Sequence, residues 1–445
     1  MNVLLLALLL AGIMVAGLLM PSSAGASVKT LRGEVALEQM YESNPDRVSA
    51  GETYDSRSSI SPRMIFTRSA QKSSLALRYA PSLVYSYQTK DERVNHRGSG
   101  EYEVYLARRL RLNLRDTYVQ ADDLYIYSEV REVSDGELEM TDRRGRREYW
   151  INQFAGSMNL EYARESFLDV GYANDLLRNR EDGFTDFTRH KPFSSISYRF
   201  NQRWGSKLDY AYTLIEYDDS FDDDDGDDER KIHEGGGMLD YKLSPLTRLF
   251  MRGIYQRTVY EDSIREYEVY TATVGIDRQL SPFRSVAFES GYSRIKREDF
   301  SDKDAFNLKM AVDTVMERGA YRLYAESGTD ELYYRGIDKD ELSLYWRVGA
   351  RINHGLTENI SGNAEIYYSE AEFLERDESE RQVWYSARAG LSYRFARYYE
   401  LSAGYSFTDV DAADRIDPTG REIDDSYQNH HVFIRLTAGK DLLKW

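Results

Sequence analysis

Charged residues recur at alternate positions in many short runs of the chain, and they are the first candidates for chemistry. Apolar or aromatic residues stand between them, so a β-strand would present one charged face and one apolar face. An arginine or lysine that faces lipid at mid-depth costs roughly 2–4 kcal/mol, so in a membrane the charged face must border water. Eight residues chosen in this way are candidates for the lining of a wet lumen: Arg111, Arg115, Lys207, Asp209, Arg347, Arg351, Glu365 and Arg388.

Two roles are open to these pore-lining candidates. Opposite charges can pair across neighbouring strands and hold the wall together. Alternatively, some of the charges can form a constriction that selects solutes by charge. The two roles do not exclude each other, and alternation alone puts the residues on one face without putting them at one depth.

The 6 histidines form no recognisable metal or catalytic motif. None lies at ligand spacing from a second histidine, the chain has no cysteine, and His430 and His431 would point to opposite faces of a strand. A hydrolytic site on a barrel needs a histidine paired with serine or aspartate at one rim, and no such grouping recurs in a loop. We therefore expect no catalytic residues, no metal ligands, no cofactor and no enzymatic activity.

The segment 218–229 is the most acidic stretch of the chain. Carboxylates are calcium ligands, but an EF-hand pattern aligned on Gly226 places Phe221 in the first ligand position and Ile232 in the last. Because the specific motif fails, we interpret the segment as a self-repelling, solvated external loop. Weak binding of divalent cations is the alternative.

Strands of alternating polar and apolar residues are the elements that would position the charges. In one example, Leu77 and Tyr79 fall on one face of a strand and Arg78 falls on the other. The predicted strands lie near residues 31–41, 57–68, 73–88, 97–108, 110–120, 147–163, 166–177, 188–200, 203–217, 231–243, 247–260, 266–279, 282–296, 303–315, 318–328, 340–352, 358–372, 380–395, 398–409 and 426–440.

The connections between these strands alternate in length as well. Those after even-numbered strands are short turns, whereas those after odd-numbered strands are longer and charged, as at 42–56, 121–146 and 218–230. Bacterial outer-membrane barrels have an even number of strands, short periplasmic turns and long external loops. The sequence therefore predicts an all-β fold, a transmembrane antiparallel up-and-down β-barrel of about 20 strands, within a range of about 18–22.

Glycines in two strands suggest local irregularities. The run Gly235, Gly236 and Gly237 in the tenth strand predicts a bend or bulge in the barrel wall. In the last strand, Leu443 and Trp445 are out of phase with the preceding apolar residues, and a bulge near Gly439 would correct this.

Composition agrees with a barrel and excludes several other classes. The mean hydropathy of -0.62 excludes a helical membrane protein but not a barrel, because only every second strand residue must be apolar. The net charge of -17 argues against nucleic acid as a partner, and the lack of cysteine excludes lipidation and disulfide bonds. The uniform Tyr-rich texture indicates a single domain over residues 27–445.

The N-terminal segment resembles a secretory signal. Residues 3–20 form an apolar run that ends at Pro21, and small residues at 24–26 resemble a cleavage site. We interpret residues 1–26 as a signal peptide. Because no lysine or arginine precedes the apolar run, an uncleaved anchor is the alternative.

Short motifs near the N-terminus support a family assignment. The chain has the sequence Gly-Glu-Val-Ala-Leu-Glu-Gln-Met-Tyr-Glu-Ser-Asn at 33–44 and Ser-Ile-Ser-Pro at 59–62. In its organisation it resembles the outer-membrane β-barrel porins associated with exopolysaccharide and exosortase (PEP-CTERM-type) loci in Gram-negative bacteria. It departs from them in having Glu42-Ser43 where two acids are usual. The resemblance implies an outer-membrane barrel with a polysaccharide-related role and brings no catalytic residues.

Two functions follow from this fold. The first is a channel or porin, because about twenty strands enclose more space than side chains can fill, and it could serve exopolysaccharide export or secretion. The alternative is a non-conducting scaffold or adhesin whose acidic loops bind a glycan or a partner protein. The expected location is the cell outer membrane. The expected partners are its lipid and lipopolysaccharide, the barrel-assembly machinery and, if the resemblance holds, polysaccharide.

Overall fold

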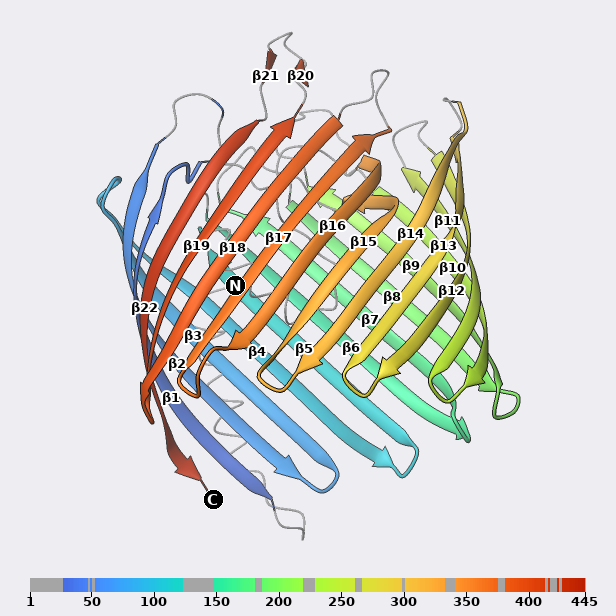
Figure 1. The fold of residues 1–445 in the computed structure, drawn as a ribbon, viewed down its shortest axis with the longest axis horizontal. Helices are drawn as coiled ribbons and strands as arrows, with labels where there is room; N and C mark the ends of the chain where they lie inside the picture. Colours follow the sequence, from blue (N-terminus) through green and yellow to red (C-terminus); the bar gives the residue numbers. More distant parts are fainter. Residues whose placement is uncertain are drawn as a thin grey trace.

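The computed structural model describes residues 27–46, 49, 53–122, 148–180, 186–218, 229–260, 266–297, 301–332, 341–374, 381–412, 415–416, 422–423 and 426–444. Within them, twenty long antiparallel strands form one closed barrel, and a small hairpin, β20 (Arg415–Ile416) with β21 (Glu422–Ile423), forms a separate sheet (Figure 1). The predicted signal peptide, 1–26, lies outside the described residues.

The barrel strands follow one another around the wall in chain order. They are β1 (Val28–Glu42), β2 (Asp55–Ala70), β3 (Ser73–Ser86), β4 (Asp91–Ala107), β5 (Leu110–Ala121), β6 (Tyr149–Ala163), β7 (Ser166–Asn179), β8 (Asp186–Arg199), β9 (Trp204–Asp218), β10 (Glu229–Ser244), β11 (Thr247–Tyr260), β12 (Glu266–Ser281), β13 (Arg284–Arg297), β14 (Lys303–Met316), β15 (Gly319–Leu332), β16 (Glu341–Gly355), β17 (Ile360–Phe373), β18 (Arg381–Ala396), β19 (Tyr399–Ala412) and β22 (Tyr427–Lys444).

The first strand closes the barrel. It pairs with β2 on one side and with β22 on the other, from Thr30 opposite Lys444 to Glu42 opposite His431. Because β22 also pairs with β19, every barrel strand has two neighbours. A closed sheet satisfies its backbone hydrogen bonds internally, which a spanning structure needs in lipid.

The period-2 pattern of the sequence becomes the two faces of this wall. Large apolar side chains such as Leu208 and Val274, each 60% exposed, lie on the outer face, where a bilayer would cover them. Lys207 and Asp209, which flank Leu208 on β9, lie on the opposite, lumenal face. All twenty predicted strands are confirmed, as is the alternation of short turns with longer connections (Figure 1). None of the described residues forms a helix long and apolar enough to cross a membrane.

Two local predictions were wrong. The connection between the strands predicted at 73–88 and 97–108 is shorter than expected, because β4 already begins at Asp91, and the Arg93 side chain bonds to the carboxylate of Asp122 on the lumenal side (2.9 Å). The predicted bulge at 235–237 is absent, since β10 pairs with β9 and β11 in unbroken register there.

The irregularity predicted near Gly439 in the last strand is confirmed, three residues further along. The register shifts where Arg32 is opposite Asp441 and Leu31 is opposite Leu443, so the extra residue is Leu442 rather than Gly439. The Leu442 side chain covers Gly33, where an added Cβ would come within 3.0 Å of it. The shift restores Leu443 to the phase of the outer face.

Candidate functional site: the lumen

The eight pore-lining candidates all lie on the face opposite the exposed apolar residues. Three of them form one group on adjacent strands, because Arg351 is opposite Glu365 and Glu365 is opposite Arg388. The Arg351 guanidinium donates to Glu365 through Nη2 and Oε1 at 2.9 Å. Glu365 therefore lies between two arginines.

Three further candidates lie close to a carboxylate. Arg347 Nη1 donates to Glu326 Oε1 on β15 at 3.1 Å, and Lys207 Nζ lies 3.6 Å from Asp209 Oδ1 on β9. Arg111 Nη1 lies 3.7 Å from Glu103 Oε2, and Arg115 is exposed in the middle of β5. The pairing role weighed from the sequence is thus present, and whether the same residues line a conducting path stays a prediction.

The structure does not bring all eight residues together. With strands about 4.8 Å apart and tilted by about 40°, twenty strands give a backbone-to-backbone diameter of roughly 40 Å. Arg111 and Arg115 on β5 lie across this lumen from the group on β16–β18. Side chains from opposite walls cannot meet over that distance, so the arginines form separate patches rather than one ring.

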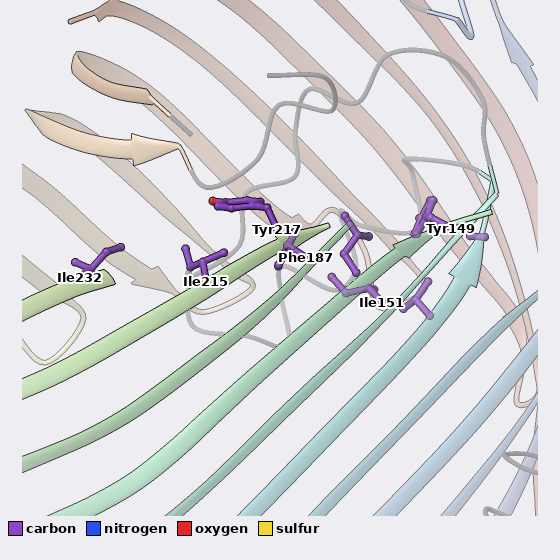
Figure 2. Packing of buried hydrophobic residues seen from close by; sticks show 9 residues of the cluster. Tyr149, Ile151, Phe187, Ile215, Tyr217 and Ile232 are labelled. Atoms are coloured by element: carbon purple, nitrogen blue, oxygen red, sulfur yellow. The ribbon is translucent and has the colours of Figure 1, made fainter. Parts of the chain in front are cut away.

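Sequence reasoning missed an apolar cluster inside the lumen, at the loop ends of β5–β10. Its side chains stand on the lumenal side of the wall, and Phe187 and Tyr217 pack with their ring centroids 6.5 Å apart (Figure 2). All are at most 5% exposed. The lumenal apolar cluster consists of Val119, Ala121, Tyr149, Ile151, Leu177, Phe187, Ile215, Tyr217 and Ile232.

A signal for this cluster was present in the sequence. Toward the loop ends of these strands the alternation gives way to adjacent apolar residues, as in Trp150-Ile151, Leu176-Leu177 and Leu214-Ile215. Two apolar faces on one strand end indicate that neither face borders water. At the lumenal apolar cluster, the inner face of the wall is therefore no longer in contact with water.

A second apolar cluster narrows the mouth above β12–β17. It joins Tyr267 and Ile295 to Leu374 at the end of β17, where Arg297 Nη1 donates to the Leu374 carbonyl. Nearby, Lys303 Nζ donates to Glu372 Oε1 at 2.9 Å. Since β13 and β17 are four places apart around the barrel, the wall between them must bend inward at the loop end for these groups to meet.

Buried polar residues occupy the loop end of the lumen where β22, β1, β2 and β3 meet. Arg57 Nε donates to Asp55 Oδ2 at 2.8 Å, and its Nη2 lies 3.5 Å from Glu42 Oε2. Ser86 Oγ donates to Asp55 Oδ1 at 2.9 Å, and Asn429 Nδ2 donates to Glu42 Oε1 at 2.8 Å. These five residues, here called the seam network, join the first and last strands.

Metal sites were not expected, and the described residues contain no group of three or more His, Asp or Glu side chains that could hold an ion. His430 and His431 do point to opposite faces, since His430 bonds to outward Tyr405 whereas His431 is buried on the lumenal side. The acidic segment lies outside the described residues except for Asp218 and Glu229, so its divalent-cation binding stays a prediction.

Comparisons with solved structures reflect this architecture. A crystal structure of a mutant ferric enterobactin receptor (PfeA) from Pseudomonas aeruginosa in complex with enterobactin matches 92% of this chain and 81% of its own, with 8% identity and a TM-score of 0.54. The siderophore receptor PirA of the same organism matches 92% and 80%, with 8% identity and a TM-score of 0.51. OpdQ, also from Pseudomonas aeruginosa, matches 93% and 98% at 10% identity and a TM-score of 0.44.

At such low identities the two receptor structures share only the fold with this chain. No curated protein matches it. A family model matches residues 204–438, from the first residue of β9 into β22, which is more than half of the sequence. The chain therefore belongs to the Putative beta-barrel porin 2 family, and it is a porin-like β-barrel of the cell outer membrane.

Proposed function

We propose that the protein is a channel whose lumen passes hydrophilic solutes and selects them by charge. The observation that carries this proposal is the exposed charged wall on β16–β18, where Arg351, Glu365 and Arg388 lie on adjacent lumenal positions. The side chain of Arg351 is 52% exposed although it is paired with Glu365. A barrel of this width leaves far more space than such side chains can fill.

The solute class follows from the resemblance to porins of exopolysaccharide loci. Polysaccharides are hydrophilic, and a lumen lined by paired charges offers hydrogen-bond donors and acceptors without a strong net field. We therefore propose polysaccharide export or secretion as the function of this channel. The proposal includes no catalytic step and no cofactor, and it takes the barrel-assembly machinery and outer-membrane lipid as partners.

Conductance of the refolded protein in a planar bilayer tests the proposal. Wild-type protein should conduct, and a salt gradient should give a reversal potential that reports its selectivity. The double variant Arg351→Gln with Arg388→Gln removes two positive charges around Glu365, so selectivity should shift toward cations. The matched variant Glu365→Gln removes the carboxylate from the same patch and should shift selectivity toward anions.

A refolded barrel without conductance would overturn the channel and favour the non-conducting scaffold. That outcome has a structural basis in the lumenal apolar cluster and the bent wall at the mouth, both of which reduce the open cross-section. If the protein conducts but both variants keep the wild-type reversal potential, the β16–β18 wall does not line the path. Migration of unboiled protein on an SDS gel confirms folding in each case.

A further inference from the structure

The outer face of β9–β13 contains a groove of about 630 Å³. Gly237, Gly253 and Ala272 form its floor on three neighbouring strands, in one row of the sheet. Leu208 and Tyr292 stand at the two ends of that row. The groove lies on the lipid-facing side, so its natural occupant is part of the bilayer.

The wall does not need glycine at the centre of this groove. A Cβ added at Gly253 would come no closer than 4.0 Å to the nearest atom, the carbonyl oxygen of Thr271. Glycine at this position therefore makes the groove deeper and is not needed to avoid a steric clash. Atoms that line an unfilled depression lack dispersion partners on one side, and an acyl chain would supply them.

Polar side chains stand four residues closer to the loops on the same strands. One row of the sheet holds His233, Arg257, Glu268 and Lys296. The hydroxyl of Tyr210 lies 2.9 Å from His233 Nδ1. With that hydroxyl as the donor, a neutral imidazole carries its proton on Nε2 and can donate outward.

The cations of this row are held in place by their neighbours. Lys296 Nζ lies 5.1 Å from the centroid of the Tyr270 ring, and Glu268 accepts hydrogen bonds from Tyr255 at 2.9 Å and from Tyr270 at 2.8 Å. Arg257 is paired with Glu266. An ammonium and an imidazole N–H therefore face outward two same-face rows above the floor of an apolar groove, where phosphates can bind while an acyl chain reaches down into the groove.

We propose that this groove and the row above it bind the lipid A part of lipopolysaccharide from the outer leaflet. One acyl chain lies over Gly237 and Gly253. His233 on β10 and Lys296 on β13 are three strand spacings apart, about 14 Å, so one of the two lipid A phosphates accepts a hydrogen bond from His233 Nε2 and the other from Lys296. The assignment to the outer leaflet follows from the general rule that the longer loops of such barrels face outward.

Another histidine of the barrel, His96, can serve as a control for His233. Four outward tyrosine–histidine pairs share one geometry, in which the histidine lies two residues nearer the loop than the residue opposite the tyrosine. They are Tyr79–His96, Tyr172–His190, Tyr210–His233 and Tyr405–His430, at 2.9, 2.6, 2.9 and 2.8 Å. The pair on β3 and β4 is remote from the β9–β13 groove, so His96 has the tyrosine bond of His233 without the groove.

Native mass spectrometry of the refolded full chain, titrated with lipid A, tests the proposal. Wild-type protein should retain one tightly bound lipid. Gly253→Leu should fill the groove and abolish this species, and the double variant His233→Phe with Lys296→Leu should raise its Kd at least tenfold. Gly100→Leu on β4, where an added Cβ lies 3.4 Å from Leu77, and His96→Phe should leave binding unchanged.

Each alternative occupant has its own outcome. Equal retention of phosphatidylglycerol would overturn the choice of lipid A, because that phospholipid shares the phosphate and the acyl chains. Loss of a dimer in the Gly253→Leu spectrum would make the groove a contact between copies of the chain. Unchanged lipid binding in both groove and headgroup variants would remove the site altogether. Gly253→Val replaces Gly253→Leu if the larger side chain prevents folding, which gel migration reports.

Discussion

At the loop end of the lumen, side chains on two sides of the barrel wall are buried from solvent in two different ways. The seam network around Arg57 uses charges and directional hydrogen bonds between strands from opposite ends of the chain. The lumenal apolar cluster on β5–β10 uses side chains such as Leu177 and Phe187 that touch without directional bonds. The two regions differ because only the seam must fix the register between segments that are far apart in the sequence.

The seam must fix one register between segments almost the whole chain apart. Asn429 and Glu42 are 387 residues apart in sequence, and a slip of one residue would turn Glu42 and Arg57 to the outer face. Hydrogen bonds and ion pairs that are lost on such a slip favour the one register in which the barrel closes. Strands β5–β10 follow one another in the chain and are joined by their own hairpins, so apolar contacts that depend on area suffice there.

The largest effect is expected from breaking the seam network. Replacing Arg57 by Met removes a guanidinium from the carboxylates of Glu42 and Asp55, each at most 2% exposed. Removing one partner from a buried ion pair costs roughly 3–5 kcal/mol. Urea unfolding of the refolded barrel in lipid vesicles should show this loss.

The matched control for the seam is Arg351→Met, which removes the same group from an exposed pair. Exposed ion pairs contribute about 0–1 kcal/mol, so this variant should unfold close to wild type. Equal losses for both arginines would mean that burial does not distinguish the seam from the open wall.

A smaller loss is expected from a cavity in the lumenal apolar cluster. Leu177 is fully buried, and Leu177→Ala should cost roughly 3 kcal/mol, within the range of about 2–5 kcal/mol for such truncations. The neighbouring Leu176→Ala acts on the outer face of the same strand, where lipid can fill the space, and should cost much less. The same urea titration compares the two, and similar losses would contradict burial on the lumenal side.

The smallest effect sharpens the contrast between directional and non-directional contacts. Phe187→Leu keeps an apolar side chain in the cluster and should cost less than about 1.5 kcal/mol. Ser86→Ala removes far less volume but also removes a hydrogen bond to the buried carboxylate of Asp55, and such bonds are worth about 1.5–3 kcal/mol. If Ser86→Ala is more stable in urea than Phe187→Leu, the seam network tolerates the loss of a hydrogen bond. The contrast between directional and non-directional contacts would then be wrong.

The sequence by itself determined the strands, their faces and the alternation of turns and loops. These features are local: a period of 2 assigns Leu208 and Lys207 to opposite faces whatever their neighbours are, and connection length is visible in the chain. For the same reason the eight pore-lining candidates were identified as one face of the wall.

Only the tertiary structure decided which of these residues meet and which are dry. Register places Glu365 between Arg351 and Arg388 and places Arg111 across the lumen from them, and neither relation is visible in a local pattern. Burial of Leu177 and Arg57 depends on their neighbours in the closed barrel, which are not adjacent in the sequence. The groove at Gly253 arises because three small residues from three successive strands fall into one row, and register between strands is a property of the paired sheet rather than of any one strand.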